Sequence, residues 1–189
     1  MAGVKLFMDG TVDNGTAWLE APDRHGESTR AFWPDPLRYT RVIGALHRAG
    51  VPTATHAIGD RGNRIVLDTY EYALKGRGAR PEHRWRVEHA QVLASEDIPR
   101  FAQLRLVASM QPTHCISDKR FCEKRIGTER SKGAYAWRSL LNAGAKVAFG
   151  TDYQVEPLNP MEGLYAAVTR KDRLGEEGEG WFPEEKLTM

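Results

Sequence analysis

Three side chains that can bind a metal stand at the ends of short apolar runs in this sequence. His56, His89 and Asp152 each close a run that is typical of a buried β-strand. In parallel sheets the carboxyl ends of the strands meet at one edge, and functional side chains gather there. Imidazole and carboxylate groups are ordinary ligands of zinc and other divalent first-row metals. The recurrence of the pattern therefore predicts a metal site at the mouth of a parallel sheet.

Each of these residues also has a structural interpretation. A single histidine at a strand end is often a hydrogen-bonding or loop-packing residue, and Asp152 could cap the turn that follows it. Lys5 could protect an exposed strand edge, but its apolar neighbours favour burial, where a lysine needs a special role. Glu88 is expected to point to the opposite side of its strand from His89, with Arg86 or a neighbouring helix as its ion-pair partner.

Further polar residues stand close to the same strand ends. Asp9, Gln111 and His114 are candidates for substrate binding. His114 falls in a polar stretch, and we interpret it as a solvated or substrate-contacting residue rather than a ligand. The remaining histidines are expected at the surface, and these are His25, His47 and His83.

The composition is that of a protein that folds around a hydrophobic core. Hydrophobic residues make up 41% of the 189 residues, and 27 basic residues nearly balance 25 acidic ones. This balance argues against nucleic acid or an anionic membrane as the main partner. No apolar stretch approaches the roughly 18 residues that span a bilayer. Cys115 and Cys122 could bridge, but they lack the spaced framework of secreted domains. We therefore expect a cytoplasmic protein.

Strand and helix patterns alternate along the chain. Strands are expected at 4–8, 51–57, 85–90, 106–111 and 146–150. Helices are expected at 36–49, 61–74, 95–104, 133–142 and 157–170, and long functional loops at 11–35 and 112–132. This alternation is typical of right-handed βαβ units, in an α/β fold whose parallel sheet is open or closed into a barrel.

Short motifs distributed along the chain resemble the amidohydrolase superfamily. They are VKLFMDG at 4–10, THAIGDR at 55–61, VEHAQ at 87–91, ASMQP at 108–112, FGTD at 149–152 and Glu156-Pro157. Each motif is weak alone, but their order and spacing make the resemblance specific across nearly the whole chain. The most similar branch includes N-substituted formamide deformylases and many uncharacterised amidohydrolase-3 proteins.

The resemblance implies a partial TIM (β/α)8 barrel, with strands four to eight in a single domain over residues 1–189. It also implies a divalent metal, expected to be zinc, bound by Lys5, His56, His89 and Asp152. In this superfamily carboxylation can turn the strand-four lysine into an anionic ligand that bridges two metals. Burial favours the neutral amine that takes up carbon dioxide.

The implied reaction is hydrolysis of a C–N amide-type bond, or of an ester bond, in a small molecule. A bound metal activates water for attack on the carbonyl carbon. Asp152 is the implied catalytic residue, because it can take the proton of that water and hand it to the leaving amine or alcohol.

One part of the family pattern is missing. The His-x-His pair of the first barrel strand does not occur in this sequence. We therefore expect the chain to be a fragment of a larger enzyme, from which a paired metal site cannot form alone. The alternative is a non-catalytic partial barrel that assembles with another chain. Two unpaired strand edges, at the strands of Lys5 and Asp152, predict a homo-oligomer.

Overall fold

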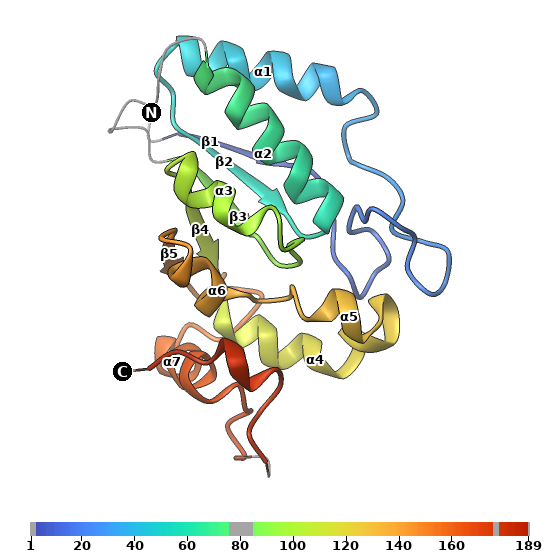
Figure 1. The fold of residues 1–189 in the computed structure, drawn as a ribbon, viewed down its shortest axis with the longest axis vertical. Coiled ribbons are helices and arrows are strands. Elements are labelled where there is room, and N and C mark those ends of the chain that lie inside the picture. The colour runs from blue at the N-terminus through green and yellow to red at the C-terminus, as the bar shows by residue number, and fades with distance from the viewer. Residues whose placement is uncertain (1–2, 76–84, 176–177, 189) are drawn as a thin grey trace.

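Five parallel strands form one sheet in the order in which they occur along the chain (Figure 1). The computed structural model describes residues 3–75, 85–175 and 178–188. The strands are β1 (Val4–Phe7), β2 (Thr53–Ala57), β3 (Arg86–His89), β4 (Val107–Met110) and β5 (Lys146–Phe149). Sequential order without reversal distinguishes a segment of a barrel from a doubly wound sheet. The structure confirms the predicted α/β partial barrel.

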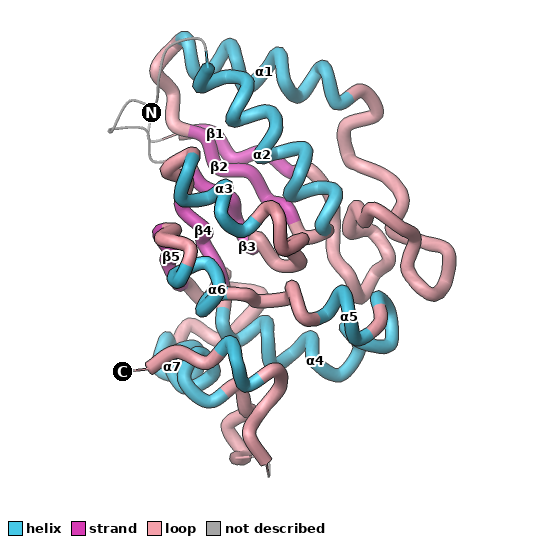
Figure 2. Tube along the Cα trace, in the orientation of Figure 1, coloured by secondary structure: helices cyan, strands magenta, loops and turns pink. Residues whose placement is uncertain are grey.

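Helices connect the strands, and some of them cover one face of the sheet. They are α1 (Pro36–Arg48), α2 (Asp60–Lys75), α3 (Ile98–Gln103), α4 (Pro112–Ile126), α5 (Thr128–Ser131), α6 (Trp137–Asn142) and α7 (Pro160–Thr169), followed by the 3-10 turn Pro183–Glu185. Figure 2 shows α2, α3 and α6 lying over the strands. Beneath them Val87 and Ala108 are fully buried. None of the described helices is long and apolar enough to cross a membrane.

The opposite face of the sheet is open. Phe7 is 48% exposed and lies in register with His56 and Glu88 on the two following strands. Lys5, two residues before Phe7, is exposed as well, so the expected burial of this lysine is wrong for this chain. The physical reason is that a closed barrel would enclose this face, whereas five strands leave it accessible. Glu88 forms the expected ion pair with Arg86.

Buried hydrogen bonds attach β2 to the helices that cover it. The Thr55 hydroxyl lies 2.9 Å from the hydroxyl of Tyr39 on α1 and 2.9 Å from that of Tyr70 on α2. All three side chains are fully buried. Asn63 on α2 donates to the carbonyl oxygens of Gly59 at 2.9 Å and Val92 at 3.1 Å. These bonds position the ends of β2 and β3 relative to one another.

Several elements differ from the sequence-based prediction, among them the helix expected at 157–170, which begins at Pro160. The predicted loop at 112–132 is wrong, because 112–126 form α4, whose core contacts are few: Pro112, Cys115, Cys122 and Ile126. The helix expected from Ser95 begins only at Ile98, after a turn. The helix expected at 133–142 is confined to α6, because a bridge to Val92 holds Ala134 in an extended conformation. No helix or strand of the described chain lies between β1 and α1, as predicted.

The histidines outside the strand ends differ in their exposure to solvent. His25 is exposed, as predicted. The surface prediction for His47 is wrong: this side chain is 6% exposed, and its ring lies 4.9 Å from that of Trp85. The helical stripe of α1 carries His47 toward the core, because it follows Tyr39 and Ile43 at the spacing of one helical turn. His83 lies outside the described residues.

Candidate metal centre

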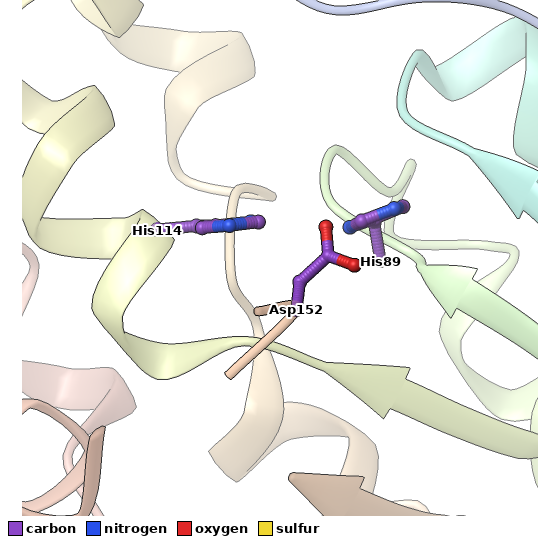
Figure 3. A group of neighbouring side chains, drawn as sticks. All are labelled: His89, His114 and Asp152. Carbon is purple, nitrogen blue, oxygen red and sulfur yellow. The ribbon is translucent and has the colours of Figure 1, made fainter. Parts of the chain in front are cut away.

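His89, His114 and Asp152 meet at the carboxyl end of the sheet (Figure 3). A ring nitrogen of each histidine and a carboxylate oxygen of Asp152 all lie within 4.8 Å of one another. In Figure 3 the two imidazole rings point toward each other with the carboxylate between them. His89 ends β3, His114 lies in the first turn of α4 after β4, and Asp152 follows β5. One donor therefore stands at or just after the end of each of three consecutive strands.

Left-handed backbone at two of these positions directs the side chains to the site. His89 has φ 72° and Asp152 has φ 51°, a region that residues other than glycine adopt rarely. Val87 is buried beneath the helices, and regular strand alternation would send His89 to the same face. The turn at the strand end brings its ring to the mouth of the sheet instead. Such backbone strain is typical of functional sites.

The histidines have the properties that a metal requires. His89 Nδ1 and His114 Nε2 are buried without a hydrogen-bond partner among the described residues, which ordinarily costs about 1–3 kcal/mol per group. Burial, together with the imidazoles of His56 and His114, lowers the pKa of His89 to about 3. Burial lowers the pKa of His114 as well. Both rings are neutral at neutral pH, which is the form that binds metal. The residues present therefore fit a divalent metal.

His56 lies beside this group. Its ring centroid is 4.5 Å from that of His89, and its Nε2 is 3.0 Å from the carbonyl oxygen of Gly10. A ligand histidine commonly donates one ring N–H to a carbonyl, which orients the other nitrogen toward the metal. Burial lowers the pKa of His56, so this imidazole is neutral too. His56 and Lys5 remain predicted ligands next to the three residues that converge.

A cavity of about 580 Å³ opens from this group of side chains. It is lined by the four predicted metal ligands, Lys5, His56, His89 and Asp152, and by His114. The loop after β1 and one face of α4 form the remaining walls, with Val155 and Glu156 at the side of β5.

Asp9 and Gln111 are not among the residues that line this cavity. Asp9 is fully buried, and its carboxylate accepts backbone N–H bonds from Trp18 at 2.8 Å, Ile58 at 2.9 Å and Gly59 at 2.8 Å. It thereby ties the loop after β1 to the end of β2. Gln111, 5% exposed, donates to the Ser109 carbonyl oxygen at 3.3 Å. For both residues substrate binding remains a prediction, whereas the contacts of Asp9 position the mouth of the sheet.

A model of the amidohydrolase family matches residues 1–189. The chain belongs to the amidohydrolase family. Protein LONG AFTER FAR-RED 3 of Arabidopsis thaliana is 35% identical over 195 residues, which cover 100% of this chain and 32% of that protein. An N-substituted formamide deformylase of Arthrobacter pascens is 27% identical over 142 residues, or 75% of this chain and 25% of the deformylase.

The fold of this amidohydrolase chain matches that of a solved relative. The crystal structure of an uncharacterized metal-dependent hydrolase from Pyrococcus horikoshii OT3 superposes with a TM-score of 0.80 at 30% identity. The match covers 98% of this chain and 36% of the hydrolase. The amidohydrolase chain thus spans about a third of the length of its relatives or less, and it shares the fold of a hydrolase that depends on a metal.

Sequence reasoning placed His114 near the substrate but did not group it with the metal ligands. The loop that the sequence predicts at 112–132 gives His114 no fixed direction. A signal was present, because Pro112 directly after a strand occupies the first helical position that proline favours. A helix starting there places His114 in its first turn, at the mouth of the amidohydrolase sheet.

Proposed function

We propose that this chain carries the metal-binding part of a hydrolase that cleaves a C–N amide-type bond, or an ester bond, in a small molecule. The convergence of His89, His114 and Asp152, with two buried ring nitrogens that lack a partner, carries the proposal. A divalent metal, which we propose to be zinc because the donors are imidazole and carboxylate, supplies Lewis acidity and activates water when bound. The name of the formamide deformylase relative supports an amide-type bond.

Asp152 is the proton carrier in this proposal. Its carboxylate is half-buried and lines the cavity, next to the two neutral imidazoles. A carboxylate in that position can accept a proton from the attacking water and pass it to the nitrogen or oxygen of the leaving group. Lys5, which lines the same cavity, would add an anionic ligand if it is carboxylated.

The size of the cavity supports a small-molecule substrate. Its volume of about 580 Å³ lies within the range of small-molecule sites, so neither nucleic acid nor a membrane is required as a partner. Cys115 and Cys122 are free thiols, and both are buried on α4. Free thiols suit the cytoplasmic location that we propose.

Metal analysis of the purified chain tests the proposal. After dialysis against limiting zinc, we expect the wild type to retain on the order of one ion per chain. His89→Gln should lose most of it, whereas His25→Gln, which removes an exposed imidazole, should bind as the wild type does. A metal-loaded chain that hydrolyses N-formyl-butylamine would add the reaction. Equal metal retention by His89→Gln and the wild type would refute the site.

A second candidate function is assembly with another chain. β1 and β5 each pair on one side only, and three of the four residues of β5 are exposed. Unpaired strand edges promote association, so we propose a homo-oligomer formed through them. Light scattering over a wide concentration range should give a mass above that of one chain. A monomer at every concentration would exclude this candidate without affecting the metal site.

A further inference from the structure

α4 presents a line of side chains to the cavity beyond the candidate metal centre. His114, Ser117, Asp118 and Phe121 all line it, and their spacing of three and four residues places them on one face of the helix. At a rise of 1.5 Å per residue, Asp118 stands about 6 Å along the helix axis from His114. A substrate whose carbonyl lies at the metal centre would extend along α4 past Asp118.

The Asp118 carboxylate is held by one oxygen only. Its Oδ2 accepts a hydrogen bond from Gln91 Nε2 at 2.7 Å and another from the Tyr135 hydroxyl. Gln91 is 3% exposed and Tyr135 is 2% exposed, so both donors belong to the core. No hydrogen bond to Oδ1 is formed from the described part of the chain. The two donors thus fix the carboxylate and leave its second oxygen for a group that enters the cavity.

The charges around Asp118 leave this anion unpaired. It forms no ion pair with a described side chain, and the carboxylates of Asp13 and Glu156, which lie near it, line the same cavity. Burial, with further contributions from these two like charges, raises the pKa of Asp118 to about 6, so the carboxylate is still mostly ionised at neutral pH. An unpaired, half-buried anion is costly unless a cation compensates it. Glu156 is itself engaged with the Ser117 hydroxyl at 2.7 Å.

The cavity holds a second unsatisfied group that is independent of these carboxylates. His89, 6% exposed, lines the same space, and its buried Nδ1 has no partner among the described residues. A bound metal would satisfy this ring nitrogen. The Asp118 carboxylate has no cation at ion-pair distance among the described side chains, although the exposed Lys5 and Arg120 line the same cavity. A ligand that reaches from the metal to Asp118 is extended, and a positive charge at its remote end would pair with this carboxylate.

We propose that Asp118 is a specificity-determining residue that selects amide substrates carrying an ammonium group a few bonds from the scissile carbonyl. The proposal rests on the proposed hydrolase function and names its substrate class. A neutral N–H donor would satisfy the geometry of Oδ1, but only a cation also compensates the charge of Asp118 and its two acidic neighbours. Substrates with a carboxylate at the same distance are repelled.

A matched pair of ligands tests the proposal on the zinc-loaded chain. The ligands are the mono-N-formyl derivatives of 1,3-propanediamine and of butylamine, in which a methyl group replaces the distal ammonium. Calorimetric titration gives their dissociation constants and steady-state kinetics their KM values. We expect the wild type to prefer the formamide of the diamine at least tenfold in both. Asp118→Asn should abolish the preference, whereas Asp35→Asn, the same change at a residue that does not line the cavity, should retain it.

The outcomes separate this inference from the proposed function. Hydrolysis of both formamides with equal KM by the wild type overturns the role of Asp118 and leaves the hydrolase intact. A tenfold preference for the formamide of the diamine without turnover supports Asp118 and contradicts hydrolysis. A wild type without this preference overturns the role of Asp118 even if Asp118→Asn fails to fold. If that variant folds and keeps the preference, the assignment to Asp118 is wrong.

Discussion

The two sides of the candidate metal centre differ in how deeply the fold buries them. On the side of β2 and β3, His56 and His89 are 8% and 6% exposed, among strands and helices joined by buried hydrogen bonds. On the side of β5, Phe149 is 37% exposed and Tyr153, the residue after Asp152, is 61% exposed. Folding of this chain therefore fixes the histidines together with its core. Asp152 is held by its local backbone at an open edge, so its loss should affect the metal and not the fold.

The substitution with the largest expected effect on stability lies on the side of β2 and β3, at Gly59. A Cβ at this position would lie 2.1 Å from the Trp18 carbonyl oxygen, which is backbone and cannot move aside cheaply. We expect Gly59→Ala to lower the free energy of unfolding by about 3 kcal/mol or more, measured by urea unfolding of the metal-free chain. Gly44→Ala is the matched control, because its nearest contact is the end of the Arg48 side chain at 3.4 Å.

The control should change stability by no more than about 1 kcal/mol, since alanine is favoured in a helix interior. Similar unfolding midpoints for Gly59→Ala and Gly44→Ala would show that the close approach of the β1 loop to the end of β2 does not stabilise the histidine side, which is the side of β2 and β3 that holds His56 and His89.

The sequence predicted this side of the molecule better than the other parts. The run from Val51 to Asp60 combines β-branched residues, a histidine and a glycine before a helix, so local pattern and burial agree. α4 was missed because its polar surface carries few core residues, and its position depends on packing against α5 and α7 rather than on its own periodicity. Lys5 was expected to be buried because its neighbours in β1 are apolar, whereas the open face of five strands leaves it exposed.

The site itself was predictable only where a residue ends a strand. His56, His89 and Asp152 could be found from that pattern, and all three line the cavity. The grouping of His89 with His114 depends on the direction of α4, and the contact between Asp118 and Tyr135 joins residues that are 17 apart in sequence. Such contacts follow from tertiary packing and leave no periodic signal.

His89 should also make the free energy of unfolding depend on pH. In the unfolded chain His89 takes up a proton near its ordinary pKa of 6.5, whereas burial keeps it neutral in the folded chain down to about 3. Below pH 6.5 the unfolded state therefore binds more protons, and stability falls as the pH falls. From about pH 7.5 to about pH 5 this residue should account for a loss of about 2 kcal/mol in the metal-free chain.

Urea unfolding at several pH values measures this loss. His89→Gln should flatten the dependence on pH by close to one proton, because glutamine does not titrate. His25→Gln should leave the slope unchanged, since the imidazole at that position is exposed. If the two variants give the same slope, His89 is not kept neutral by the fold, and the histidine side is more open to water than its burial indicates.

The smallest effect on stability is expected on the other side, at Asp152. No described side chain forms an ion pair with this carboxylate, and it lies on the exposed side of the cavity, so Asp152→Asn should change the free energy of unfolding by less than about 0.5 kcal/mol. Zinc affinity should nevertheless fall by more than about tenfold, because even the loss of a group that orients a ligand has that effect. The two measurements together are decisive. A large loss of stability would mean that Asp152 belongs to the core in the same sense as His89, whereas unchanged zinc affinity would mean that the histidines bind the metal without the β5 side.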